Sequence, residues 1–242
     1  MVDGERMIAR FTRPPGTGRV PAVLVVPGFP RGTGGAATAT NVYESFVQRL
    51  PDDVGWAAMT VWFRGTGPSE GNFSMEGWRR DVAAAADHLL ARPDVTGLWL
   101  IGFRLGGSLA IVHAARDERI RGLATLAAPA SLRAWASDPE RFHKYCRRVG
   151  VLRDPDFPPD IEAWARSIAE TDPLAVAPEL VGRQWLIVHG TDDETIPIDD
   201  PRALVAACPT AQLRVLGHGV HRLRHDPRAV ALVIGWLASQ GP

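Results

Sequence analysis

Apolar and polar residues follow two different periods along this chain. Short, almost continuous apolar runs recur from residue 20 onward, and the stretches between them place their apolar residues three and four positions apart. A continuous apolar run is typical of a strand covered on both faces of a parallel sheet, whereas the longer spacing is typical of a helix. We therefore expect strands at 20–26, 56–63, 98–103, 122–127, 184–189 and 212–216. Helices are expected at 41–50, 74–91, 105–117, 201–207 and 226–239.

The order of these elements predicts a mostly parallel, doubly wound α/β sheet with right-handed crossovers. Residues 5–14 alternate only weakly and are expected to add an edge strand. Asn41 and Ser74 are the polar residues expected to cap the helices that begin beside them.

The pattern changes at 131–180. Here short helix-like pieces are separated by prolines and carry scattered aromatic residues, with no apolar run that would predict a strand. We predict a helical insertion over 131–180 between two parts of one core, 1–130 and 181–242.

One stretch organises the chain. The buried run 98–103 turns directly into a helix through Gly102-Phe103-Arg104-Leu105-Gly106. A strand that turns into a helix between two glycines has the layout of a nucleophile elbow, whose central residue sits on a strained turn at the end of the sheet. The central residue here is Arg104. A guanidinium stays protonated and has no lone pair for attack, so Arg104 excludes an acyl-enzyme at this position.

Three further motifs follow the expected strands. They are Pro27-Gly28-Phe29, the run 189–197 that contains Asp193, and Gly217-His218-Gly219-Val220-His221. Together with the elbow, they make the chain resemble the α/β-hydrolase superfamily over nearly its whole length, in the family order of nucleophile, acid and histidine.

The resemblance implies a role for several residues. Asp193 is expected as the acid and His221 as the histidine that it orients. The backbone N–H groups of Phe29 and Leu105 are expected to form an oxyanion hole. The insertion at 131–180 lies where the family often carries a helical cap over its pocket. The departure from the family is Arg104, because the elbow usually holds Ser, sometimes Cys or Asp.

Arg104 has three interpretations. Its planar fork is suited to holding the carboxylate or enolate of a ligand. It is also placed to form a salt bridge with Asp192, Asp193 or Glu194, or to fold into the cap as a plug. An unpaired buried guanidinium is costly, so each interpretation requires an anion close by.

Other candidate residues have simpler explanations. Ser108 lies one helical turn past the elbow, in the helix body, and Cys146 is expected to be a buried thiol without an activating neighbour. The spacing of His218, His221 and His225 is compatible with metal binding, but no cysteine or carboxylate cluster completes a ligand set. We expect neither a metal nor a cofactor.

The composition of the chain argues against nucleic acid and membranes as partners. The 27 Lys and Arg residues balance 27 Asp and Glu residues, so no overall charge attracts nucleic acid or an anionic membrane. Two cysteines make no disulfide framework, and the first ten residues lack the apolar core of a signal peptide. We expect a cytoplasmic protein with a small-molecule ligand; the oligomeric state, monomer or homodimer, is left open.

Two functions fit these residues. The first is an enzyme without a serine nucleophile, in which His221 and Asp193 provide a general base and an oxyanion is held by Arg104 and the two backbone donors. Non-covalent hydrolysis, lysis or rearrangement are reactions open to such a site. The second is a catalytically silent homologue that binds a small acid or a protein partner.

Overall fold

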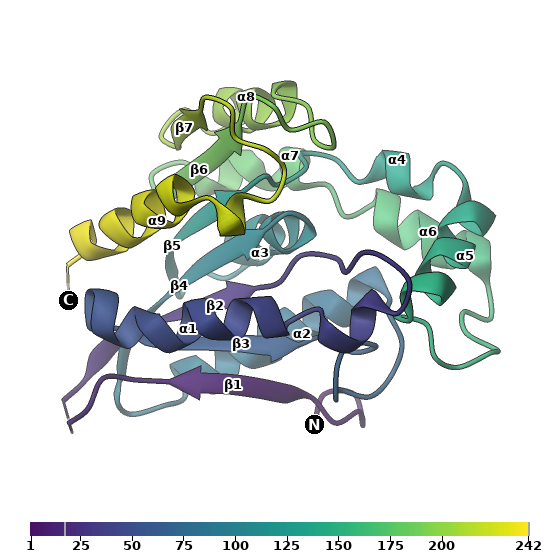
Figure 1. Cartoon of the computed structure of the whole chain (residues 1–242), viewed down its shortest axis with the longest axis horizontal. Helices are drawn as coiled ribbons and strands as arrows, with labels where there is room; N and C mark the ends of the chain where they lie inside the picture. The colour runs from purple at the N-terminus through teal and green to yellow at the C-terminus, as the bar shows by residue number, and fades with distance from the viewer. Residues whose placement is uncertain (17, 242) are drawn as a thin grey trace.

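The sheet is the centre of the structure. A computed structural model describes residues 1–16 and 18–241, and seven strands in it pair in the order β1-β3-β2-β4-β5-β6-β7 (Figure 1). The first strand, β1, is antiparallel to β3, and all other pairs are parallel, as the pattern of buried runs predicts. The strands are β1 Ile8–Thr12, β2 Val20–Val26, β3 Ala57–Trp62, β4 Val95–Phe103, β5 Ile120–Leu126, β6 Gln184–Gly190 and β7 Gln212–Leu216.

Helices cover both faces of the sheet, so the doubly wound prediction is confirmed. The successive residues of β2 alternate between two cores: Val23 and Val25 pack with α1 and α9, and Leu24 packs on the other face with α2, α3 and α8. These helices are α1 Asn41–Val54, α2 Met75–Leu90, α3 Leu105–Arg116, α8 Asp199–Ala207 and α9 Pro227–Ser239.

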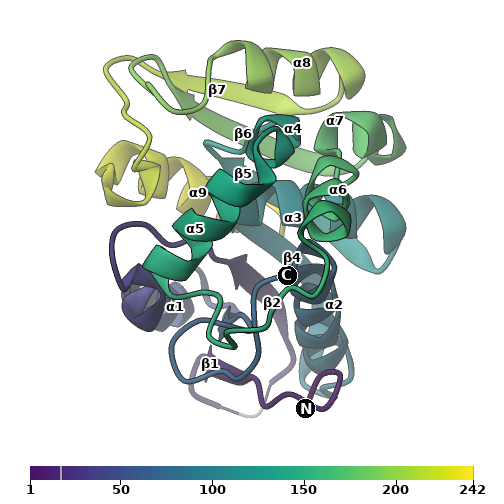
Figure 2. The ribbon, with the colours of Figure 1, turned by 90° about the vertical axis from the view of Figure 1, so that its right-hand side faces the viewer.

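The chain between β5 and β6 is helical. It forms α4 Arg133–Ala136, α5 Pro139–Val149, α6 Ile161–Ala169, α7 Pro173–Val176 and the 3₁₀ turn η2 Ala177–Leu180. Helices α4, α5 and α6 contact one another and lie together beyond one end of the strands (Figures 1 and 2). The later pieces, α7 and η2, contact α3 instead. The limits of a separate cap at 131 and 180 therefore stay a prediction.

Several element ends differ from the sequence prediction. Ser74 caps α2 as expected, since its Oγ accepts the N–H of Gly77 at 3.0 Å. Asn41 is the first residue of α1, and Thr40 takes the N-cap position without a capping hydrogen bond from its side chain. Strand β4 begins at Val95 and not at 98, because Val95 pairs with Val20 across the sheet. Two 3₁₀ turns, η1 Gly35–Thr38 and η3 Leu223–His225, have no counterpart in the prediction.

Helix α1 runs past the end expected at residue 50. Pro51 lies inside its last turns and has no N–H to give to the carbonyl of Val47. The hydroxyl of Thr12 donates to that carbonyl at 3.0 Å, so the acceptor left by the proline is satisfied from β1. The helix continues to Val54 because a neighbouring strand replaces the missing bond.

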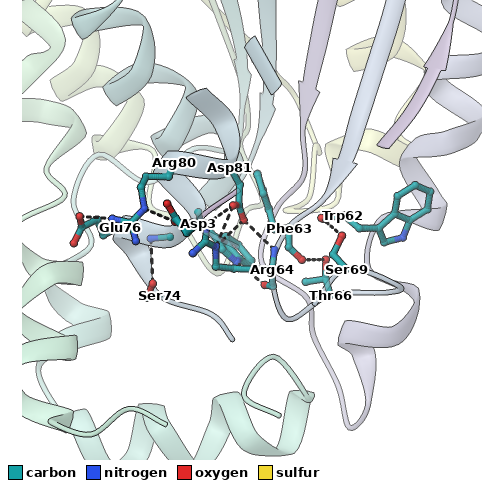
Figure 3. Close-up of polar contacts among 12 residues, drawn as sticks. Asp3, Trp62, Phe63, Arg64, Thr66, Ser69, Ser74, Glu76, Arg80 and Asp81 are labelled. Atoms are coloured by element: carbon teal, nitrogen blue, oxygen red, sulfur yellow. Dashed lines mark hydrogen bonds and ion pairs between the residues drawn. The ribbon is translucent and has the colours of Figure 1, made fainter. Parts of the chain in front are cut away.

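A buried ion pair fixes the connection from β3 to α2 (Figure 3). Arg64 follows β3, and its Nη2 lies 2.6 Å from Oδ1 of Asp81 on α2. The other oxygen of Asp81 accepts the backbone N–H of Arg64 at 2.9 Å, and Arg64 also contacts Asp3 at 2.9 Å. The Asp81 carboxylate is fully buried, so it serves both the charge and the backbone donor of Arg64.

Replacing Asp81 with Ala is expected to lower the free energy of unfolding by about 3–5 kcal/mol, because the N–H of Arg64 would lose its acceptor and the buried guanidinium would keep only the half-exposed Asp3. Urea unfolding followed by circular dichroism measures the change. Glu76→Ala is the matched control on the same helix: its pair with Arg80 is exposed, so its loss is expected to cost less than about 1 kcal/mol. Equal losses in the two variants would contradict this assignment.

Candidate functional site

The turn between β4 and α3 is strained. Arg104 has φ 55° and ψ −123°, a backbone conformation that L-residues rarely adopt. The neighbouring glycines explain how the turn fits, because a Cβ on Gly106 would lie 2.2 Å from the carbonyl oxygen of Val26. A Cβ on Gly102 would lie 2.5 Å from the carbonyl oxygen of Gly106. The elbow geometry that the Gly-x-x-x-Gly spacing predicts is therefore formed, with Arg104 at its centre.

Two backbone donors lie beside this turn. Among the described residues, the N–H groups of Phe29 and Leu105 form no hydrogen bond. The loop that carries Phe29 abuts the elbow, since a Cβ on Gly28 would lie 3.2 Å from Cβ of Arg104. The N–H of Gly28 donates to the hydroxyl of Tyr43 at 3.1 Å, which holds the loop in place. Both donors expected for an oxyanion hole are thus without an acceptor among the described residues.

Asp193 and His221 are brought together. Nδ1 of His221 lies 2.9 Å from Oδ2 and 3.0 Å from Oδ1 of Asp193. The carboxylate also accepts the backbone N–H groups of Thr195 and Ile196, each at 2.9 Å. Burial disfavours ionisation of Asp193, yet these hydrogen bonds lower its pKa below 3.8. The carboxylate is therefore charged and fixes which nitrogen of His221 carries the proton.

The other nitrogen of His221 has no partner. Nε2 is buried and forms no hydrogen bond within the described chain, and the residue is 8% exposed. Burial lowers the pKa of His221 below 6.5, although the hydrogen bond that it donates to Asp193 raises it, and the charge of Arg104 lowers it further. The imidazole is neutral at pH 7, with a lone pair available on Nε2.

Arg104 does not form the salt bridge that was one of its three interpretations. Its guanidinium forms no ion pair with Asp192, Asp193 or Glu194, and its Nε is buried without a partner in the described chain. It lines a cavity of about 210 Å³ together with Tyr43 and three more arginines, Arg31, Arg222 and Arg224. Burial, followed by the charge of Arg31, lowers the pKa of Arg104 to about 10. Arg104 remains a cation at neutral pH.

The side chain of Phe29 connects this site to the inserted helices. Its ring packs on one side against Phe73 and Trp78, and on the other against Trp135, Phe142 and Tyr145, with ring centroids 5.0–6.1 Å apart. The backbone donor of Phe29 is therefore held by aromatic contacts from α2, α4 and α5.

The remaining candidate residues do not join the site. The Ser108 hydroxyl donates to the carbonyl of Pro129 at 2.8 Å and is fully buried. Cys146 is buried, and burial raises the pKa of its thiol. Across residues 1–16 and 18–241, no three His, Cys, Asp or Glu side chains gather as metal ligands, so His218, His221 and His225 do not form a site.

No helix in the same part of the chain is both long and apolar enough to cross a bilayer.

Comparison with solved structures identifies the fold. Est1E from Butyrivibrio proteoclasticus, solved with ferulic acid bound, matches with a TM-score of 0.77 at 19% identity, covering 99% of this chain and 96% of Est1E. The mouse α/β hydrolase domain-containing protein 10 matches with a TM-score of 0.70 at 18% identity, over 98% and 94% of the two chains. The chain has the α/β-hydrolase fold.

Sequence comparison adds a partial relative of this α/β-hydrolase-fold protein. The uncharacterized protein YfhR of Salmonella typhi is 33% identical over 156 residues, which are 60% of this chain and 47% of YfhR. The chain spans about half the length of the curated relatives it matches. No family model matches the sequence.

The sequence did not predict the residues around Arg104. Tyr43 lies on α1, whose apolar face predicts only core packing, and Arg31 follows the Phe29 loop. Arg222 and Arg224 come directly after His221, so their nearness in sequence to two expected site residues was the available signal. Nothing in the spacing indicated that they would meet Arg104.

Gly106→Ala is expected to destabilise the α/β-hydrolase fold by about 3 kcal/mol or more, because a methyl group would overlap the carbonyl oxygen of Val26. The control is Gly235→Ala on α9, where no atom lies within 4 Å of the added carbon. That change is expected to raise stability by about 0.5–1 kcal/mol through helix propensity. Urea unfolding measures both, and a neutral Gly106→Ala would disprove the tight elbow.

Removing the charge of Arg104 is expected to raise the pKa of His221, because a nearby cation then no longer disfavours the imidazolium. The measurement is an NMR titration of the His221 ring in wild type, Arg104→Gln and the exposed Arg10→Gln. The wild type should titrate below 6.5, Arg104→Gln closer to 6.5, and Arg10→Gln as the wild type does.

The lowered pKa of His221 also makes the stability of the protein depend on pH. Because the pKa of His221 is lower in the folded state, its contribution to folding is present above pH 6.5 and is lost as the pH falls through the folded pKa. A wild-type His221 that titrates above 6.5 would contradict the geometry described here.

Proposed function

We propose that this α/β-hydrolase-fold protein is an enzyme without a covalent nucleophile that acts on a small organic substrate. One observation carries the proposal. Asp193 and His221 form their pair, while Arg104 forms no ion pair with an Asp or Glu among the described residues. A degenerate site in which Arg104 paired with Asp193 would have neither a base nor a free cation.

The simplest reaction for such a site is direct hydrolysis of an ester. Nε2 of His221 takes a proton from water, whose oxygen attacks the carbonyl carbon and turns the carbonyl oxygen into an oxyanion. The guanidinium of Arg104 and the N–H groups of Phe29 and Leu105 stabilise this charge. The tetrahedral intermediate collapses, the C–O bond to the leaving group breaks, and imidazolium returns the proton to the alcohol. Asp193 stabilises the imidazolium throughout.

The same groups fit lysis or rearrangement. In those reactions the proton removed by His221 comes from the substrate, and the negative charge that develops is an enolate. Arg104 then has the same role, because its charge is fixed close to the base and does not depend on the type of oxyanion.

A second candidate is a homologue that binds a small acid without catalysis. The observation that favours it is steric: Nε2 of His221 is buried, and the rings of Trp135, Phe142 and Tyr145 pack directly against Phe29. An enzyme would need these groups to open a path for the substrate.

A panel of short aryl esters distinguishes the two functions. We expect wild type to release the aryl alcohol without a burst phase. His221→Gln is expected to be about 10²–10⁴-fold slower, which is the usual contribution of a general base. Arg104→Ser is expected to show a burst and an acyl group on residue 104 by mass spectrometry, because the elbow then holds a hydroxyl.

The outcomes separate the candidates. An inert wild type together with an active Arg104→Ser variant means that the base and the oxyanion hole work but the native role is binding. A wild-type rate that His221→Gln leaves unchanged overturns the general base. Cys146→Ala is the control for an unintended thiol nucleophile. Its activity should equal that of wild type, because Cys146 is buried and burial raises the pKa of its thiol, which keeps it protonated.

A further inference from the structure

The cavity beside Arg104 is lined by cations and no anions. Its twelve lining residues include Arg31, Arg104, Arg222 and Arg224, and none is Asp or Glu. We call these four residues and their cavity the arginine pocket. The chain as a whole has equal numbers of acidic and basic residues, so four arginines without an acid are a local departure from its composition.

Two of these half-buried guanidinium groups each have one buried nitrogen without a partner in the described chain. The Nε atoms of Arg104 and Arg224 are both inaccessible to solvent and form no hydrogen bond within residues 1–16 and 18–241. Arg224 is held over the ring of Tyr43, with its guanidinium carbon 5.8 Å from the ring centroid. Buried polar atoms are normally paired, and no Asp or Glu lines the cavity, so an anionic ligand would supply the partner that these two nitrogens lack.

A neutral donor lines the same cavity. Tyr43 accepts the N–H of Gly28 and keeps its own hydroxyl proton for a further acceptor. The arginine forks and this hydroxyl can all donate, and none of the lining side chains is a carboxylate.

The position in the sheet is one at which α/β folds bind ligands. Strands β2 and β4 are neighbours, but the chain leaves β2 toward α1 on one face and leaves β4 toward α3 on the other. Their carboxyl ends open a crevice at this change of direction, which is the usual ligand site of open α/β sheets. Gly28 follows β2 and Arg104 follows β4, so the arginine pocket lies in that crevice.

We infer that the arginine pocket binds a phosphate group, either free or as part of a phosphorylated small molecule. A carboxylate has two oxygens and one charge, too few for four guanidinium groups and the Tyr43 hydroxyl. A phosphate group has more acceptor oxygens and close to two charges at neutral pH, and arginine forks match its geometry.

This inference names the ligand class for the site of the proposed function and rests on its assignment of Arg104 as the anion-holding group. It does not depend on catalysis by His221, which does not line the cavity. The phosphate would be held by the four arginines. The group to be transformed would lie toward His221, with its oxyanion on the N–H groups of Phe29 and Leu105 and on a donor of Arg104 that the phosphate leaves free.

Isothermal titration calorimetry with inorganic phosphate tests the inference. All titrations use one ionic strength, set with sodium chloride, because bulk screening alone weakens arginine contacts. We expect wild type to bind phosphate at least about tenfold more tightly than acetate, and Arg104→Gln and Arg224→Gln each to weaken phosphate binding about tenfold or more. Arg10→Gln, which removes the same charge from an exposed site on β1, should bind as the wild type does.

Thermal unfolding without phosphate provides a second readout. Arg104→Gln is expected to be at least as stable as wild type, because it relieves repulsion among neighbouring cations, and to lose the rise in Tm that phosphate gives wild type. A large loss of stability in Arg104→Gln without phosphate would show a structural role and overturn the inference.

Three results of the calorimetry also overturn the inference: no phosphate binding beyond that of chloride, acetate binding as tight as phosphate, or equal loss in Arg10→Gln. Propyl phosphate distinguishes the two sources: tighter binding than phosphate supports a phosphorylated small molecule, and weaker binding supports free phosphate. Phosphate binding by a protein that turns over no ester would refute the proposed function alone. Ester turnover that depends on His221, without phosphate binding, would refute the phosphate pocket alone.

Discussion

The close approach of the β4–α3 turn to the end of β2 is the constraint on which the site depends. Gly106 faces the carbonyl oxygen of Val26 with no room for a side chain, so the chain must turn within a few residues. The price is the strained backbone of Arg104, a conformation that costs about 1–3 kcal/mol. In return, the N–H of Leu105 and the side chain of Arg104 both lie at the crevice between β2 and β4. Tight packing thus determines where the charge lies.

A neutral imidazole and a cation can lie close together at this turn, because each favours the charge state of the other. Arg104 lowers the pKa of His221, and a neutral imidazole in turn does not repel Arg104. The negative charge of Asp193 is held on the far side of the imidazole by two backbone N–H groups and Nδ1. Asp193 therefore contacts His221 without neutralising Arg104, and this separation leaves a neutral imidazole and a cation close together.

The fold and the motif residues were predictable because each depends on local sequence. The buried runs gave the strands, and the spacing of Gly102 and Gly106 gave the elbow. The end of α1 was not predictable, since Thr12 supplies a hydrogen bond from a distant strand. The arginine pocket was not predictable either. Arg31, Arg104 and Arg224 follow three different elements, and only the packing of those elements brings their charges together.

The ring of Phe29 has a consequence for movement. Because it is held between aromatic residues of α2 and those of α4 and α5, a displacement of the inserted helices must pull on the loop between β2 and α1. A movement of α4 and α5 that opens a path for a ligand would therefore also change the contacts that hold the N–H of Phe29.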